Sequence, residues 1–369
     1  MIKDILNKLQ LTKDDIVNLL KTQGDDRQEL FEYSAKIKEE YVQNKVYLRG
    51  LIEFSNICGK NCYYCGIRRS NTKVKRYNLS DDDILNAAYY AYKNNYGSIV
   101  MQSGELEDKK FTSRVTSLLK RISEFSKGKL RVTLSCGEQS LEIYKEWFKA
   151  GAERYLLRIE ASNKELYMKL HPNDELHAYE RRRQALKDLR TAGYQTGTGV
   201  MIGVPFQTYE DLADDLLFMQ NIDIDMVGMG PYLEHKDTPL YQYKDLLLPK
   251  EERFDLSLKM IALLRIMMKD INIAASTAMQ SIDPQGREKA IEVGANVFMP
   301  NLTPCYVRGE YKLYEDKPCT DENPEDCQRC VEQRIASVSN DIAYGEMGDS
   351  MHYVKRLPAE GLLRRRATP

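Results

Sequence analysis

Short apolar and β-branched runs recur along the chain and alternate with longer, charged stretches. Charged, helix-compatible stretches separate most of them, for example Asp81–Asn94, Phe111–Ser126 and Tyr209–Gln220. Eight such units in series predict a complete (β/α)8 TIM-type barrel of the α/β class. A doubly wound open sheet is the alternative, but it usually stops at about five to seven strands. The predicted strands are Val46–Phe54, Ser98–Gln102, Leu130–Leu134, Tyr155–Ile159, Thr196–Ile202, Met226–Met229, Ile271–Ala275 and Val297–Met299.

The same pattern divides the chain into three parts. Residues 1–45 form a predicted N-terminal helical extension, since helix-compatible sequence runs from Ile2 to about Asn44. Residues 46–304 carry the barrel, and residues 305–369 form a C-terminal extension that contains cysteines. No low-complexity linker divides the chain, and 42% hydrophobic residues in a chain of 369 suffice for a substantial core. We assign no role to the tail from about Leu357.

Charge and cysteine usage narrow the class of protein. Lys and Arg number 54 and Asp and Glu 55, so the net charge of -1 predicts no nucleic-acid partner and no attraction to a membrane surface. No apolar run approaches the length of a membrane span, and the N-terminus lacks a signal-peptide core, so we expect a cytoplasmic protein. The eight cysteines include two groups, 58/62/65 and 319/327/330, a grouping typical of metal ligation in a reducing compartment.

The first group has the pattern Cys58-x3-Cys62-x2-Cys65, directly after the first predicted strand. Three thiolates on one tight loop can hold three irons of a [4Fe-4S] cubane and leave the fourth iron open to a substrate. A structural zinc site would need a fourth Cys or His, and the first histidine is His171, far away in sequence. Free cysteines or a zinc site with a distant ligand are the alternatives. The spacing resembles the signature of the radical S-adenosylmethionine (SAM) superfamily.

Parallel barrels carry their chemistry at the carboxyl ends of the strands. The second predicted strand leads into Ser103, Gly104 and Glu105, where the glycine allows close backbone approach and the oxygens can accept from an ammonium group. An ordinary βα turn is the alternative. After the cysteine loop, this stretch resembles the motif that holds the amino group of SAM in that superfamily.

Further polar residues follow later predicted strands. Arg158 and Glu160 end the fourth strand, on one side of it, and form either part of a ligand site or a salt bridge at the rim. Ser276 and Thr277 follow the seventh and could clamp a substrate carboxylate together with Arg158, or serve as turn hydroxyls. The run of three arginines at 181–183 is by itself typical of a solvated helix face.

From about Tyr41 to Cys330 the chain resembles the HydE family of radical SAM enzymes, which take part in the maturation of [FeFe]-hydrogenase. The stretches that carry this resemblance are Ile52–Cys58, Gln102–Glu105, Arg154–Arg158, Asp225–Gly228, Ser276–Met279 and Gly294–Val297.

The resemblance implies roles for individual residues. Gln102, Ser103, Gly104 and Glu105 would form the motif for the SAM amino group, Glu160 would contact SAM, and Arg182 would contact its carboxylate. Arg158, Ser276 and Thr277 would form a deeper anion site, with Tyr311 and Tyr314 near the same cavity. Cys136 is interpreted as core packing.

The resemblance also implies a reaction. A reduced [4Fe-4S] cluster would cleave SAM to methionine and a 5′-deoxyadenosyl radical. The target would be a small-molecule or organometallic iron–cysteine species on the way to the diiron subcluster of the hydrogenase H-cluster. Partner hydrogenase maturases and a reductant such as flavodoxin or ferredoxin would be its protein partners.

The second group, Cys319-x7-Cys327-x2-Cys330, has the spacing of an accessory iron–sulfur site in part of that family. Three thiolates predict a [2Fe-2S] or [4Fe-4S] cluster with a non-protein fourth ligand. Zinc with a fourth ligand from Cys305 or His352 is the alternative.

Two other functional classes remain open at this stage. The chain could be a biotin synthase-like or methylornithine synthase-like radical SAM enzyme that acts on a small carboxylate-bearing substrate. It could also be a non-catalytic iron–sulfur carrier, and SAM cleavage by the reduced protein would separate the two classes.

Overall fold

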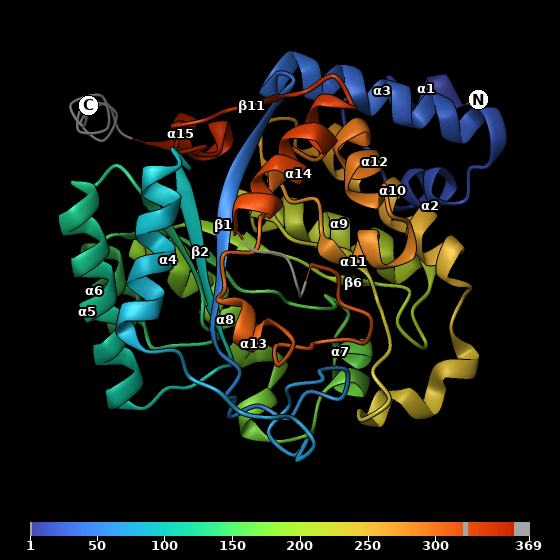
Figure 1. Cartoon of the computed structure of the whole chain (residues 1–369). Helices are drawn as coiled ribbons and strands as arrows, with labels where there is room; N and C mark the ends of the chain where they lie inside the picture. Colours follow the sequence, from blue (N-terminus) through green and yellow to red (C-terminus); the bar gives the residue numbers. More distant parts are fainter. Residues whose placement is uncertain (1, 320–323, 358–369) are drawn as a thin grey trace.

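The computed structural model describes residues 2–319 and 324–357, in which the predicted series of strands and helices is present (Figure 1). All eight predicted strands form, although several are shorter than their apolar runs. They are β1 (Lys45–Ser55), β2 (Ser98–Ser103), β3 (Arg131–Ser135), β4 (Ala152–Leu156), β5 (Gln195–Thr198), β7 (Met226–Val227), β9 (Asn272–Ile273) and β10 (Val297–Phe298).

The strands are parallel and lie in the order β10-β1-β2-β3-β4-β5-β7-β9. The two ends of this order also meet. The Asn296 amide donates to the Ile273 carbonyl, and the Ala275 amide donates to the Val297 carbonyl, both at 2.9 Å. These bonds join β9 to β10 and close the ring, which confirms the predicted (β/α)8 barrel. A second parallel pair, β6 (Met201–Ile202) with β8 (Gly230–Pro231), follows β5 and β7.

Helices surround the strands and begin at polar caps. The Ser80 hydroxyl accepts from the Asp83 amide at the start of the first barrel helix, and Asp108 caps the next by accepting from the Phe111 amide. The barrel helices are α4 (Asp81–Lys93), α5 (Lys109–Ser126), α6 (Leu141–Lys149), α7 (Lys164–Leu170), α8 (Tyr179–Ala192), α9 (Tyr209–Asn221), α10 (Lys250–Met267), α11 (Thr277–Ile282) and α12 (Gly286–Val293).

The N-terminal part is helical, as its pattern predicts. It contains α1 (Ile2–Leu6), α2 (Lys13–Leu20) and α3 (Gly24–Val42). Of these, α3 packs on α10 and α12, and α2 packs on α9 and α10, so this part covers one side of the helical ring (Figure 1).

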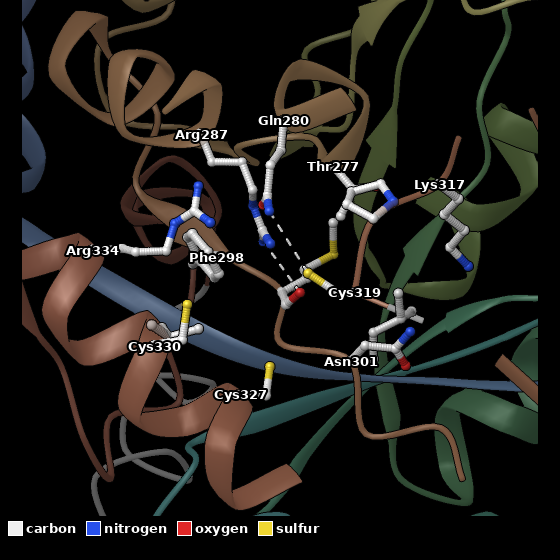
Figure 2. A pocket seen from close by; sticks show the side chains of 14 residues that line it. Thr277, Gln280, Arg287, Phe298, Asn301, Lys317, Cys319, Cys327, Cys330 and Arg334 are labelled. Carbon is white, nitrogen blue, oxygen red and sulfur yellow. Dashed lines mark hydrogen bonds between the residues drawn. The ribbon is translucent and has the colours of Figure 1, made fainter. Parts of the chain in front are cut away.

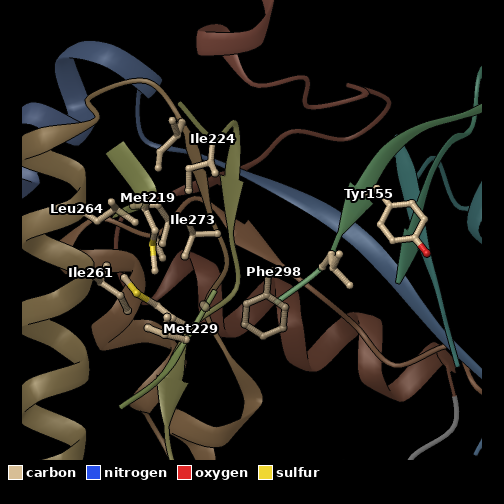
Figure 3. Packing of buried hydrophobic residues seen from close by; sticks show 14 of the residues in the cluster. Tyr155, Met219, Ile224, Met229, Ile261, Leu264, Ile273 and Phe298 are labelled. Atoms are coloured by element: carbon tan, nitrogen blue, oxygen red, sulfur yellow. The ribbon is translucent and has the colours of Figure 1, made fainter. Parts of the chain in front are cut away.

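Apolar side chains fill the space between the helices and the strands. Ile261 and Leu264 of α10 are fully buried and pack with Met219, Met229 and Ile273 (Figure 3). Such burial is the main favourable term in folding. Cys136 is fully buried in the same core, as expected. None of the described helices combines the length and the apolar character that a membrane-crossing segment requires.

The C-terminal part covers the amino ends of the barrel strands. Its β11 (Asp341–Ile342) pairs with β1 near the amino ends of the strands, and the following segment covers that end. There the Asp349 carboxylate lies 2.6 Å from the fully buried Arg154 guanidinium and accepts from the Gln195 amide at 2.6 Å. The other elements of this part are α13 (Cys305–Arg308), α14 (Pro324–Ala336) and α15 (Met351–Arg356). The carboxyl ends of the strands therefore form the end of the barrel where a site can open.

The fourth strand differs from its prediction. It covers Ala152–Leu156 instead of Tyr155–Ile159, so Arg158 and Glu160 lie on the segment after the strand. Leu157 and Ile159 are buried, so the apolar pattern continues although the ladder has ended. Glu160 has a φ of +68° and forms a bridge with Val200. The charged pair is thus placed by a loop and not by strand alternation.

Candidate active site

The first cysteine group lies on a loop that starts where β1 ends. The Gly59 amide donates to the Glu105 carbonyl at 2.8 Å, and the Gly66 amide donates to the Leu313 carbonyl at 2.8 Å. Arg76 stabilises the loop, because its guanidinium donates to the carbonyls of both Asn56 and Ile67 at 2.7 Å. The loop is therefore fixed to β2 on one side and to the C-terminal part on the other.

The three thiols of this loop are suited to metal ligation. The Cys58 sulfur accepts from the Glu105 amide at 3.3 Å. Burial raises the pKa of all three thiols, that of Cys62 to about 12. Thiolates at these positions need a compensating positive charge, which irons supply when they bind. The donor set and the burial fit an iron–sulfur cluster with one iron free of protein ligands.

Two histidines that are distant in sequence support this loop. The His177 Nε2 accepts from the Asn61 amide at 2.8 Å, and its Nδ1 lies 2.6 Å from the Asp174 carboxylate. His171 stacks on Tyr167 and lies 3.3 Å from the Tyr64 hydroxyl. Sequence spacing gave no sign of these contacts. Both histidines therefore contact residues that lie between the cysteines in sequence.

A buried group of charges lies beside the loop. Lys60 lies 3.0 Å from the Glu105 carboxylate and 2.9 Å from that of Glu138. Arg182 lies 3.3 Å from Glu105 and 2.7 Å from Glu138. Burial opposes the ionisation of Glu138, but the charges of Arg182 and Lys60 lower its pKa below the usual value. The structure thus brings Glu105 and Arg182, predicted to contact SAM, to one place, and adds Glu138, which the sequence did not reveal.

The glycines at this place are required by close packing. A Cβ on Gly104 would lie 2.2 Å from the Ile57 carbonyl oxygen, on the chain just before Cys58. Gly137 has a φ of +77°, and a Cβ there would lie 2.0 Å from the Glu105 side chain. Larger residues would push the Gln102–Glu105 turn away from the cysteine loop. Ser103 is buried and donates to the Gly104 carbonyl at 2.8 Å.

Arg158 and Glu160 contact each other. The Arg158 guanidinium donates to the Val200 carbonyl at 2.8 Å and lies 3.0 Å from the Glu160 carboxylate. Burial raises the pKa of Glu160, and the charge of Arg158 opposes that shift. One guanidinium nitrogen thus serves both contacts, while the Arg158 Nε is buried without a hydrogen bond.

The remaining predicted substrate residues lie where α11 meets the C-terminal part. The Thr277 and Tyr314 hydroxyls are 3.1 Å apart. The Ser276 hydroxyl accepts from the Ala278 amide and so caps α11. Tyr311 is buried, and its hydroxyl contacts the Gln102 side chain. Tyr311 and Tyr314 therefore connect the C-terminal part to β2 and to α11.

Sequence reasoning missed an ion pair beside these tyrosines. Glu53, on β1 opposite Gln102, lies 2.5 Å from the Lys317 ammonium group. Lys317 also donates to the Tyr311 carbonyl at 3.1 Å. The second oxygen of Glu53 is buried without a hydrogen bond. An apolar β1 pattern offers no signal that one interior position is a paired carboxylate.

The second cysteine group lines a pocket between α11, α12 and α14 (Figure 2). Cys327 and Cys330 are three apart on α14 and point into it, and Cys319 comes from the segment before α14. Gln280 donates to the Cys319 sulfur at 3.9 Å. His352 lies elsewhere, bound to Asp223 at 2.6 Å and to Asp270 at 3.1 Å, so it is not placed to complete a zinc site.

Comparison with known proteins assigns the family. The family model described as the radical SAM superfamily matches residues 52–219, which include the first cysteine group. The [FeFe] hydrogenase maturase subunit HydE of Thermotoga maritima is 45% identical over 306 residues, which cover 83% of this chain and 84% of that protein. The chain belongs to the HydE family of the radical SAM superfamily. It is therefore an enzyme, and its family implies a [4Fe-4S] cluster and SAM as cofactors.

More distant similarities agree on the fold. The 3-methylornithine synthase of Methanosarcina acetivorans is 27% identical, over 79% of this chain and 80% of that protein. A crystal structure of methylornithine synthase superposes with a TM-score of 0.79 at 22% identity and covers 93% of this chain and 97% of that one. At this identity the superposition supports the barrel fold alone.

Proposed function

We propose that the enzyme cleaves SAM reductively and acts in the assembly of the diiron subcluster of the [FeFe]-hydrogenase H-cluster. The observation that carries this proposal is the three-cysteine loop, fixed beside a buried Glu105–Arg182 pair, in a chain 45% identical to a HydE. A [4Fe-4S] cluster held by Cys58, Cys62 and Cys65 would supply the electron and the open iron for homolysis of the C5′–S bond of SAM.

The residues near the loop would bind the rest of SAM. Gln102, Ser103, Gly104 and Glu105 form a turn packed against the chain before Cys58, where carbonyl and carboxylate oxygens would accept from the amino group of SAM. Arg182 would bind the SAM carboxylate through the same fork that now contacts Glu105 and Glu138. Glu160, buried beside Arg158, would accept a hydrogen bond from SAM.

The substrate would lie between Arg158, Ser276, Thr277, Tyr311 and Tyr314. Arg158 would bind a carboxylate bidentately, with the hydroxyl of Thr277 as a further donor. The buried tyrosines and the C-terminal part above them would exclude water from the radical. We propose a small-molecule or organometallic iron–cysteine species as the substrate, delivered in the cytoplasm by a partner maturase, with flavodoxin or ferredoxin as the electron donor.

Cys319, Cys327 and Cys330 would hold a second metal centre, an iron–sulfur cluster with a non-protein fourth ligand. Their convergence on one pocket supports this proposal. Only the first cysteine group lies on the loop that follows β1, whereas Cys327 and Cys330 lie on α14. The second centre would therefore be accessory and not take part in SAM cleavage.

Maturation of an apo-hydrogenase tests the proposed function. Purified enzyme, reconstituted with iron and sulfide without oxygen, is added to the other maturases, SAM, a reductant and the apo-hydrogenase. We expect hydrogen evolution only when the enzyme is present. Full hydrogen evolution without it, together with formation of a methylornithine- or biotin-type product by the enzyme, would assign the chain to a different reaction.

A further inference from the structure

Arg287 on α12 is a buried cation beside the second cysteine group. Its side chain is only 3% exposed. The guanidinium carbon lies 3.3 Å from the centre of the Phe298 ring, and one nitrogen donates to the Met299 carbonyl at 3.2 Å. The Nε of Arg287 is buried without a hydrogen bond. In Figure 2 the side chain points into the pocket toward Cys319.

Among the side chains of residues 2–319 and 327–357, Arg287 has no carboxylate partner. The neighbouring acid, Glu288, is engaged by Arg334 at 2.8 Å. Arg287 lines the same pocket as Cys319 and Cys327. Burying a cation without a partner is costly, so natural proteins pair such groups. The thiols of the pocket are the missing anions once they are ionised.

We propose that Arg287 is the counter-ion of the metal centre held by Cys319, Cys327 and Cys330, and that it raises the reduction potential of this centre. The inference rests on the second metal centre of the proposed function. Three thiolates give an iron–sulfur centre a net negative charge, and one-electron reduction by dithionite adds another. A fixed cation nearby stabilises the more negative, reduced state. Gln280, which donates to the Cys319 sulfur, acts in the same direction.

A redox titration of the second centre tests this role. It is done in a Cys58→Ala/Cys62→Ala/Cys65→Ala background, so that only the second group holds iron, and the signal is followed by electron paramagnetic resonance. We expect Arg287→Met to shift the midpoint to a more negative potential. Arg287→Lys keeps the positive charge and should show a smaller shift in the same direction. Lys289→Met removes a cation from the same helix at a side chain that contacts Asp283 and Phe254, and we expect no shift.

Stability gives a second readout. Arg287→Met should leave the metal-free protein as stable or more stable, but should weaken the metal-loaded protein. In the metal-free protein, Arg287→Met removes an uncompensated buried charge, so its melting temperature should equal or exceed that of the parent. In the loaded protein the same change should weaken iron retention against a chelator by about 10- to 100-fold, the usual range for residues that support a metal site. An unchanged midpoint and unchanged retention in Arg287→Met would overturn the counter-ion role alone. Absence of iron from the parent background would overturn the second centre itself.

Discussion

Glu53 of β1 and Lys317 of the C-terminal part form an ion pair, with 2.5 Å between the carboxylate oxygen and the ammonium nitrogen. They are 264 positions apart in sequence, and their side chains are 2% and 6% exposed. The pair ties the C-terminal part to β1 at the position that pairs with Gln102 on β2. The C-terminal part is thereby a wall of the candidate cavity and not a separate appendage.

Replacement of one partner of this ion pair should lower the free energy of unfolding far more than replacement of both partners. Lys317→Met leaves Glu53 charged and buried, and we expect a loss of about 3–5 kcal/mol in the free energy of unfolding. The double variant Glu53→Gln/Lys317→Met should recover most of it. Urea unfolding measures both. Lys236→Met is the control, because Lys236 forms an exposed pair with Glu315 at 3.7 Å and should cost less than about 1 kcal/mol. Equal losses for Lys317→Met and Lys236→Met would contradict this account.

The two cysteine groups should be separable by mutation. Cys327→Ala/Cys330→Ala should lose iron, since two of the three thiols of the pocket are gone, and should still form 5′-deoxyadenosine from SAM. Iron analysis and chromatography of the products measure these outcomes. Complete loss of SAM cleavage in a folded double variant would show that the second group is catalytic.

Arg158 and Thr277 test the substrate site. Arg158→Lys keeps the charge but loses the planar fork, so we expect intact SAM binding and loss of productive substrate turnover. Thr277→Ala should weaken the same step by roughly 1.5–3 kcal/mol, the value for a hydrogen bond to a charged group. Thr277→Ser keeps the hydroxyl and is the matched control. Hydrogenase maturation at the wild-type rate with Arg158→Lys would leave Arg158 as a salt bridge to Glu160 only.

Asp215 on α9 should make stability depend on pH. One of its oxygens accepts from the Ser162 amide at 2.7 Å, the other is buried without a hydrogen bond, and burial raises its pKa from 3.8 to about 7. The folded protein therefore binds more protons than the unfolded chain between about pH 4 and 7, so the free energy of unfolding falls as pH rises through this window.

Asp215→Asn should remove this dependence. The variant should be more stable than the wild type at pH 8, by up to roughly 4 kcal/mol, and the difference should shrink towards pH 4. Asp214→Asn is the control, because the side chain of Asp214 is 39% exposed and pairs with Lys13 at 2.7 Å. Urea unfolding at several pH values measures the effect. A constant difference between pH 4 and 8 would show that Asp215 does not titrate in this range.

Local sequence patterns predicted those features that depend on residues close together in the chain. Apolar periodicity located all eight strands, and the position of Cys58, Cys62 and Cys65 directly after the first strand was also predicted correctly. The predicted end of β4 was wrong because Leu157 and Ile159 stay buried after the strand itself has ended at Leu156. Partners that come from distant segments had no local signal, since a paired interior charge and an exposed one look alike in sequence. This class includes the pair of Glu53 with Lys317, the contacts of Glu138, and the contact of His177 with Asn61 of the cysteine loop.

SAM cleavage by the reconstituted, dithionite-reduced enzyme tests the central claim most directly. The claim is that Cys58, Cys62 and Cys65 hold the cluster whose open iron binds SAM. We expect the wild type to form 5′-deoxyadenosine, Cys62→Ala to form none, and Cys305→Ala, which removes an exposed cysteine outside both groups, to keep the wild-type rate. Formation of 5′-deoxyadenosine by Cys62→Ala at the wild-type rate would contradict the assignment of this loop as the catalytic centre.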